Sequence, residues 1–380
     1  MREELPFADT EFDARLAKVR ATMAQRGLDT LVVTSPENIY YLSAFHTAAY
    51  DLRQALVVPI DGAPTLLNII HESEYLVPFR SWIGKRAAYS AKRPFLDALK
   101  ELLDECGGKR IGIEKTSFFF TIRDYEGLRL RMPTAEFVDG SGTVDPHRAV
   151  KSPAEIAYIR QACRVVEAGM RAGVDACAAG RFDTDVAADV HAAIFRAGGD
   201  YMSYPPFINA GWYTCLVHNT WSGKQLQPGE LVFLEISGVV KRYGAALMRS
   251  VAIGKVPEEM ERRNRIVHEV VEATMSAIRP GTTSGEVNQA CASAFQKHGY
   301  TMLKRAGYSM GINFPPGWSE GEILDLSLDN PTMLQSGMVF HIPQPYRMPG
   351  EQTVSVSETV LVTETGCEAL TQFPRELFRK

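Results

Sequence analysis

The chain is 380 residues long, with 45% hydrophobic residues, 23% charged residues and a formal net charge of −4 at pH 7. This length allows two domains with separate cores, and the composition is ordinary for a soluble globular protein. The acidic balance argues against a nucleic-acid surface, and no apolar run approaches the roughly 18 residues of a membrane span. The N-terminus lacks a signal-peptide core and the six cysteines are scattered, so we expect reduced thiols in a cytoplasmic protein.

Residues 1–147 are predicted to form an α/β domain. A charged helix is expected over residues 11–26, ending at Gly27. A turn is expected at residues 35–38, because Ser, Pro and Asn cluster there. Short apolar runs bounded by turn residues predict strands at residues 31–33, 55–60, 64–70 and 110–114.

A capping box predicts where a second domain, residues 148–380, begins its first long helix. Ser152 and Glu155 have the spacing of the box, and Pro153 stands at the first helical position. A later helix is expected over residues 258–278, and a second box opens the helix after it, at Thr283 and Glu286. Apolar runs predict strands at residues 231–236, 245–253, 338–342 and 354–362.

Part of this second region occurs twice. Residues 179–186 resemble residues 280–287, and each copy opens an apolar helical stretch that ends in glycine. Residues 226–233 are echoed by residues 334–340 in the same order. Such halves usually pack around a shared cleft, so we expect a site between them. At this expected site the first copy places Glu235 and the second copy places Pro343. These two residues do not form the symmetric set of carboxylates that a pair of metal ions requires.

The order of elements and several motifs resemble the pita-bread family of creatinase, prolidase, aminopeptidase P and methionine aminopeptidase. The motifs are Val150-Lys151-Ser152-Pro153-Ala154-Glu155-Ile156, Gly337-Met338-Val339-Phe340 and Ser357-Glu358-Thr359-Val360-Leu361-Val362-Thr363-Glu364-Thr365-Gly366. The resemblance implies an α/β (α+β) fold. A creatinase-type N-terminal α/β domain is expected over residues 1–147, and a pita-bread domain with an internal pseudo-twofold repeat over residues 148–380.

The peptidases of this family hold two metal ions with two Asp, one His and two Glu ligands. The corresponding positions here are Glu235, Ala246, Tyr308, Pro343 and Glu358. A methyl group and a proline ring offer no lone pair, and a phenol is a poor ligand at neutral pH. The resemblance therefore implies a branch that lacks the metal site and needs no cofactor.

Within this family, His218 resembles the histidine with which creatinase transfers protons in a metal-free cleavage. An imidazole can accept and donate a proton near pH 7. Creatinase is only a partial match, because Met248 and Pro343 replace its substrate-binding carboxylates.

The ectoine hydrolase branch is a closer match. The motifs that resemble it lie at residues 233–238, 307–312, 314–318 and 373–378. That branch opens a cyclic amidine carboxylate by hydrolysing a C–N bond.

The resemblance assigns roles to individual residues. The expected catalytic groups are His218, Glu235 and Glu358, and Glu235 either attacks the amidine carbon or activates water. Tyr308 and Trp318 are expected at the substrate. Arg249 is expected either to bind the substrate carboxylate or to brace the sheet.

The resemblance also implies a homodimer in which the N-terminal domain reaches into the neighbouring subunit's cleft. Tyr50 and Arg53 lie in the segment that would do so.

Three hypotheses remain open from the sequence. The first is a metal-independent hydrolase of an amidine or cyclic amide that carries a carboxylate. The second is a pita-bread domain that only binds peptides or proteins. The third is an Xaa-Pro dipeptidase or aminopeptidase with an altered metal site. A small-molecule substrate is expected, with neither a nucleic-acid nor a membrane partner.

Overall fold

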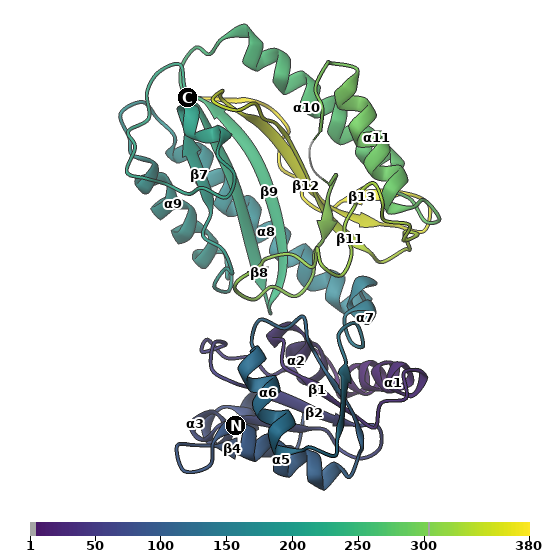
Figure 1. Cartoon of the computed structure of the whole chain (residues 1–380). Helices are drawn as coiled ribbons and strands as arrows, with labels where there is room; N and C mark the ends of the chain where they lie inside the picture. Colours follow the sequence, from purple (N-terminus) through teal and green to yellow (C-terminus); the bar gives the residue numbers. More distant parts are fainter. Residues whose placement is uncertain (1–4, 303–304) are drawn as a thin grey trace. The chain divides into compact units, whose positions relative to one another are not determined.

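The computed structural model describes residues 5–302 and 305–380, and the chain forms two compact units that divide between Arg148 and Ala149 (Figure 1). Among the described helices, none combines the length and the apolar character needed to cross a membrane.

The first unit is built on a six-stranded mixed sheet with the strand order β4-β3-β2-β1-β5-β6. The strands are β1 (Thr30–Val33), β2 (Ala55–Pro59), β3 (Thr65–Ile69), β4 (Lys85–Tyr89), β5 (Arg110–Ile113) and β6 (Glu136–Asp139). β2 runs antiparallel to β1 and β3, whereas the remaining neighbours are parallel. The four strands expected from the sequence are therefore confirmed.

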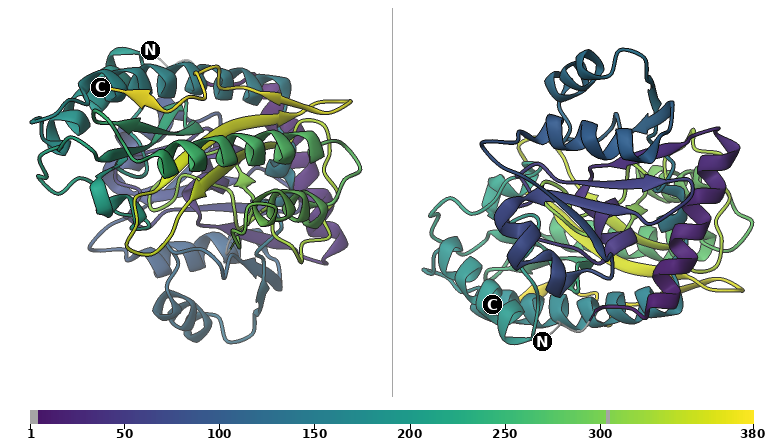
Figure 2. Two further views of the ribbon diagram at one scale, coloured as in Figure 1. Left: turned by 90° about the horizontal axis from the view of Figure 1, so that it is seen from above. Right: turned by 90° about the horizontal axis from the view of Figure 1, so that it is seen from below.

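Helices flank this sheet. They are α1 (Asp9–Gln25), α2 (Pro36–Ser43), α3 (Ile70–Tyr75), α4 (Val77–Arg80), α5 (Phe95–Cys106) and α6 (Ile122–Arg131), followed by α7 (Pro146–Ala149). Figure 2 (right) shows α1 in purple along one side of the sheet. The turn expected at residues 35–38 is wrong, because Pro36 instead begins α2. Proline is compatible with the first turn of a helix, where its missing N–H would have no partner anyway.

The second unit contains two four-stranded sheets. The first has the order β14-β9-β8-β7 and the second β10-β11-β12-β13. The strands of the first sheet are β7 (Phe207–Ala210), β8 (Leu231–Val240), β9 (Tyr243–Ala252) and β14 (Phe378–Arg379). Those of the second are β10 (Tyr308–Ser309), β11 (Val339–Tyr346), β12 (Val354–Val362) and β13 (Cys367–Ala369).

Four long helices and a short 3₁₀ helix accompany the two sheets. They are α8 (Pro153–Ala176), α9 (Asp183–Arg196), η1 (Gly211–Cys215), α10 (Glu258–Ala277) and α11 (Ser284–Gln296). Both expected capping boxes are present, with Ser152 capping α8 and Thr283 capping α11. Figures 1 and 2 show α10 lying along the sheet that contains β11 and β12.

The repeat seen in the sequence is a repeat in the structure. In the first copy the Gly180 N–H donates to the Leu226 carbonyl at 2.9 Å, and in the second the Gly281 N–H donates to the Leu334 carbonyl at 3.0 Å. Both glycines have positive φ, 87° and 83°. Only glycine adopts this backbone region without steric cost. The two loops therefore have the same backbone conformation at the same position of the repeat.

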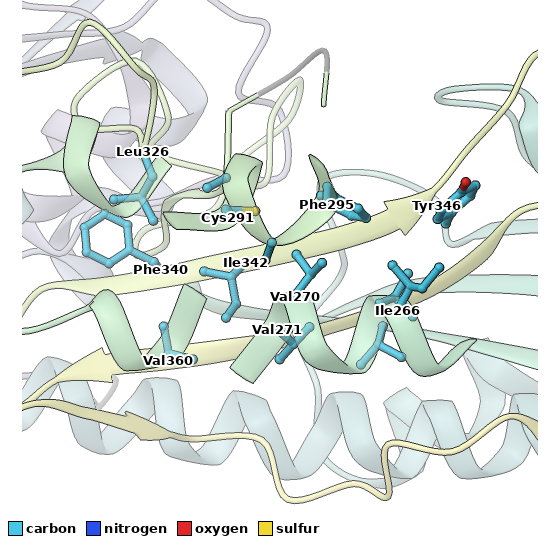
Figure 3. Close-up of a cluster of buried hydrophobic side chains, with 14 of the residues drawn as sticks. Ile266, Val270, Val271, Cys291, Phe295, Leu326, Phe340, Ile342, Tyr346 and Val360 are labelled. Atoms are coloured by element: carbon cyan, nitrogen blue, oxygen red, sulfur yellow. The ribbon is translucent and has the colours of Figure 1, made fainter. Parts of the chain in front are cut away.

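The core of the second half lies between its sheet and helices α10 and α11. Figure 3 shows Ile342 of β11 beside Val270 and Val271 of α10, and Phe340 of β11 belongs to the same cluster. One face of β12 supplies a series of alternate residues to this core, namely Val354, Val356, Val360 and Val362. Successive side chains of a strand point to opposite faces, so every second residue shares a face. Glu358 lies two residues after Val356 and two before Val360, and therefore shares the face that the helices cover.

The two sheets meet along β9 and β12, and side-chain hydroxyls join them. The Met248 N–H donates to Ser357 Oγ at 2.7 Å, and the Ser355 N–H donates to Ser250 Oγ at 3.0 Å. Thr359 Oγ1 accepts from the Ala246 N–H at 3.1 Å and donates to the Ala246 carbonyl at 2.9 Å. We call these contacts the hydroxyl seam.

Candidate active site

A cavity of about 290 Å³ opens in the second unit and takes residues from both of its sheets. Its lining consists of Phe207, Asn209, Leu216, Val217, His218, Asn219, Phe233, Glu235, Met248, Arg305, Tyr308, Pro343, Pro345 and Arg347. Strand alternation explains the pairs from single strands, because residues two apart on β8 and on β11 face the same side. This cavity therefore lies where the sequence predicts a site, between the two halves.

Glu235 is the acidic residue of this lining, and it lies in the middle of β8. Its side chain is 7% exposed, and its cross-strand neighbours are Phe207 and Met248. A carboxylate in such apolar surroundings carries a desolvation cost that a cationic ligand would offset.

His218 lies on the exposed loop that follows η1 and also lines the cavity. Its φ is 55°, a left-handed conformation that is uncommon for residues other than glycine. The loop is anchored by Asn209, whose Nδ2 donates to the Asn219 carbonyl at 2.8 Å, while Asn219 Nδ2 donates back to Asn209 Oδ1. This pair anchors the residue that follows His218, and so helps to hold His218 in a backbone conformation that costs free energy.

Tyr308 is brought into the cavity by the short strand β10. Trp318 Nε1–H donates to the Tyr308 hydroxyl oxygen at 3.2 Å. Trp318 therefore contacts Tyr308, but it is not part of the cavity lining. Burial, together with the negative charge of Glu235, raises the pKa of Tyr308. The phenol is therefore neutral at physiological pH and can donate a hydrogen bond.

His341 was missed by the sequence analysis. It is fully buried, with Nδ1 2.8 Å from the Tyr308 hydroxyl and Nε2 2.7 Å from Ser357 Oγ. The signal that could have found it is strand register: Tyr308 and His341 are direct cross-strand partners in β10 and β11. That register depends on a long-range pairing that no local pattern reveals.

Two arginines at the cavity were also missed. The Arg347 guanidinium lies 5.4 Å from the Phe233 ring centroid, and its buried Nε makes no hydrogen bond to any residue that the structure describes. Burial lowers the pKa of Arg347, and the negative charge of Glu235 opposes that effect. The Arg305 guanidinium lies 4.8 Å from the Tyr308 ring centroid and 3.5 Å from the Asp325 carboxylate. Among the described residues, the cavity lining thus combines the Glu235 carboxylate with the cations Arg305 and Arg347.

Arg249 and Glu358 contact each other, and neither belongs to the cavity lining. Arg249 is fully buried and donates at 2.8 Å to Glu358, which is 1% exposed. Its other four N–H groups donate to backbone carbonyls, those of Pro374, Met248, Ser357 and Phe373. A guanidinium has five N–H donors, so none is left for a substrate. Of the two roles expected for Arg249, these contacts favour bracing of the sheet over binding of a substrate.

The catalytic role expected for Glu358 is not supported by its position. Glu358 also accepts from Arg375 at 2.9 Å and from the Thr371 hydroxyl, so its oxygens bond to protein groups. The reason is strand alternation. Ser357, not Glu358, lies opposite Pro343 of the cavity lining, and Glu358 lies opposite Ile342 of the core.

Tyr50 and Arg53 belong to the first unit, whereas every residue of the cavity lining belongs to the second. Arg53 Nε donates to Asp124 at 3.0 Å, and the Tyr50 ring meets Phe119 edge-on with the centroids 6.3 Å apart. Asp124 in turn completes the capping box of α6. The role expected for these two residues in a neighbouring subunit's site stays a prediction.

The side chains present do not fit a pair of metal ions. Across residues 5–302 and 305–380, no group of three or more His, Cys, Asp or Glu side chains is arranged to hold one. Glu235 lines the cavity, while Ala246, Tyr308 and Pro343 are the residues at three of the ligand positions expected from the resemblance. The fifth expected ligand, Glu358, is held by two arginines on the other face of β12.

The chain is similar to proteins of known family over nearly its whole length. Residues 157–364 match the family described as metallopeptidase family M24, and residues 15–150 match the creatinase/prolidase N-terminal domain. The sequence is 30% identical to an ectoine hydrolase of Halomonas elongata over 401 aligned residues, which cover 99% of each chain. It is 24% identical to an Xaa-Pro dipeptidase of Pyrococcus furiosus, with 96% of this chain and 99% of the relative covered.

Solved structures share the fold. A prolidase from Thermococcus sibiricus has a TM-score of 0.87 at 20% identity, covering 97% of this chain and 99% of the prolidase. An Xaa-Pro dipeptidase from Bacillus anthracis has a TM-score of 0.85 at 20% identity, covering 97% and 100%. At these identities the likeness supports the expected arrangement of domains and sheets.

Replacing Glu358 with Gln should destabilise the protein. The change leaves the buried Arg249 without its counter-charge, whereas Arg375 keeps Glu272 as a second partner. Removing one partner of a buried ion pair typically costs about 3–5 kcal/mol of unfolding free energy. Urea unfolding should show this loss. The matched control is Glu368→Gln, since Glu368 pairs with Arg160 where both side chains are 40% exposed. Such pairs contribute about 1 kcal/mol or less. A Glu358→Gln variant of normal stability without activity would restore Glu358 to the catalytic set.

Proposed function

Because the chain belongs to metallopeptidase family M24 yet lines its cavity with few groups that can bind metal, we propose that it is a metal-independent hydrolase of a non-peptide C–N bond. Its substrate is a cyclic amidine that bears a carboxylate, as ectoine does. The observation that carries this proposal is the buried Glu235 in a cavity that also presents Arg347. The 30% identity to an ectoine hydrolase supports it.

Glu235 is suited to an amidinium. A carboxylate and an amidinium can form two parallel N–H···O bonds, and the attraction is stronger in a cavity that excludes water. The carboxylate then acts in one of two ways. It attacks the amidine carbon and forms a covalent intermediate, or it accepts a proton from a water molecule that attacks that carbon.

His218 is the proposed proton carrier of the reaction. It lies at the rim of the same cavity, where its imidazole can exchange protons with solvent. Opening the ring requires that the departing nitrogen gain a proton, and imidazole can supply it near pH 7.

Arg347 is the proposed anchor of the substrate carboxylate. Its side chain is half-buried at the cavity, and its buried Nε has no hydrogen-bond partner in the described part of the chain. A guanidinium donor that is already desolvated gains more from an anionic ligand than one in water does. Glu235 and Arg347 would therefore select a substrate that is cationic at the amidine and anionic at the carboxylate.

An Xaa-Pro peptidase remains the alternative because relatives and solved structures carry that activity in their names. Dipeptides would meet the same arginine through their C-terminal carboxylate. The metal-ligand positions argue against this alternative, since Glu235 is the one carboxylate among the described residues that line the cavity.

We propose in addition that the protein works as a homodimer, with Tyr50 and Arg53 of one subunit completing the cavity of the other. Such isologous interfaces are common among soluble enzymes. Arg53 is 45% exposed despite its bond to Asp124, so it can exchange that partner for a substrate.

The protein should open ectoine, and Glu235→Gln should abolish that turnover. Gln keeps the size and hydrogen-bonding reach of Glu but removes the charge that an amidinium or a nucleophile requires. Product formation and the melting temperature should be measured on both proteins, with creatine, hydantoins and Xaa-Pro dipeptides as comparison substrates. A Glu235→Gln enzyme that turns over normally, with a stability change of only about 1 kcal/mol, would mean that Glu235 is merely a satisfied polar group.

Arg347→Met should raise KM for ectoine about 10- to 100-fold while changing kcat little. Methionine keeps much of the length and loses the charge, and a hydrogen bond to a charged group contributes about 1.5–3 kcal/mol. The matched control is Arg160→Met, at a partly exposed ion pair distant from the lining in sequence and absent from it. An analogue of ectoine without the carboxylate should not distinguish wild type from Arg347→Met. An unchanged KM for ectoine itself would rule out the anchor.

A further inference from the structure

A chain of hydrogen bonds runs from the hydroxyl seam to the cavity. It begins at the Met248 N–H, which donates to Ser357 Oγ at 2.7 Å. It continues from Ser357 to His341 Nε2 at 2.7 Å, and from His341 Nδ1 to the Tyr308 hydroxyl at 2.8 Å. Trp318 Nε1–H meets the same hydroxyl from another side at 3.2 Å.

The direction of each bond follows from the donors available. The Met248 N–H can only donate, so Ser357 Oγ accepts there. Within the described residues, the one acceptor that the Ser357 hydroxyl proton can reach is His341 Nε2. Buried hydroxyl protons rarely stay without an acceptor, so Ser357 donates to Nε2. A neutral imidazole that accepts at Nε2 carries its proton on Nδ1.

This tautomer fixes the role of Tyr308. His341 Nδ1–H and Trp318 Nε1–H both donate to the phenol oxygen and occupy its two lone pairs. Among residues 5–302 and 305–380, Tyr308 has no acceptor for its own hydroxyl proton. Because Tyr308 lines the cavity beside Glu235, that proton is directed at whatever occupies the cavity.

We propose that Ser357 and His341 are positioning residues that hold Tyr308 as a hydrogen-bond donor to the substrate. The inference rests on the proposed function and deepens it. When a nucleophile adds to the amidine carbon, the C–N π electrons become a lone pair on nitrogen. The Tyr308 O–H donates to that lone pair without losing its proton, so the bond strengthens as the C–N bond weakens. The opposite tautomer of His341 would instead take the Tyr308 proton for itself.

Tyr308→Phe should therefore lower kcat for ectoine about 10²-fold or more while changing KM little, as loss of a donor to the transition state does. Ser357→Ala should lower kcat roughly tenfold, within the range of couplings seen inside one hydrogen-bond network. Ser357→Thr keeps the hydroxyl and should restore kcat. In the Tyr308→Phe background, Ser357→Ala should cause no further loss. An equal loss in both backgrounds would overturn the proposal, because Ser357 would then act through the fold alone.

A second measurement does not depend on turnover. In protein labelled with ¹⁵N at histidine, the His341 signals are those that disappear in His341→Gln. At neutral pH they should show a proton on Nδ1 and none on Nε2 in the wild type, and a shift toward Nε2 protonation in Ser357→Ala. A wild-type imidazole protonated only at Nε2 would overturn the proposal. Failure to open ectoine with the expected tautomer present would count against the proposed function alone.

Discussion

The site depends on the way two separate sheets are joined at β9 and β12. Serine and threonine hydroxyls carry the hydrogen bonds of this seam, and the fully satisfied guanidinium of Arg249 locks the strands to the C-terminal segment. These side-chain bonds join the two sheets, and the cavity takes lining residues from both of them. The buried pair of Arg249 with Glu358 joins β9 of one sheet to β12 of the other.

The hydroxyl seam between β9 and β12 also affects the chemistry of the cavity. Ser357 takes part in the seam and also determines, through His341, which way the Tyr308 hydroxyl points. The chain belongs to a family described as metallopeptidases, and its cavity presents the carboxylate of Glu235 together with the phenol of Tyr308 and the proline ring of Pro343. What remains is an array of fixed hydrogen-bond donors and opposite charges, the arrangement that stabilises charge as it moves within a substrate.

Local signals in the sequence predicted the fold well. Capping residues located the starts of α8 and α11, apolar runs located the strands of both sheets, and the repeated segments predicted two related halves around a site. Pro36 was misread because proline suits both a turn and a first helical turn. The position of Glu358 away from the cavity lining could have been expected from the sequence, since it lies at every-second-residue spacing with Val354, Val356, Val360 and Val362 and so shares their apolar face. Arg347 and His341 could not be found, because their roles depend on strands that meet only in the folded chain.

The central claim is that the chemistry of this site is performed by side chains without a metal ion. Protein purified without chelator should contain far less than one metal ion per subunit by elemental analysis, and the same preparation should open ectoine at an unchanged rate after treatment with EDTA. Two tightly bound ions per subunit, with activity that is lost on chelation and restored by adding a divalent metal, would contradict the account.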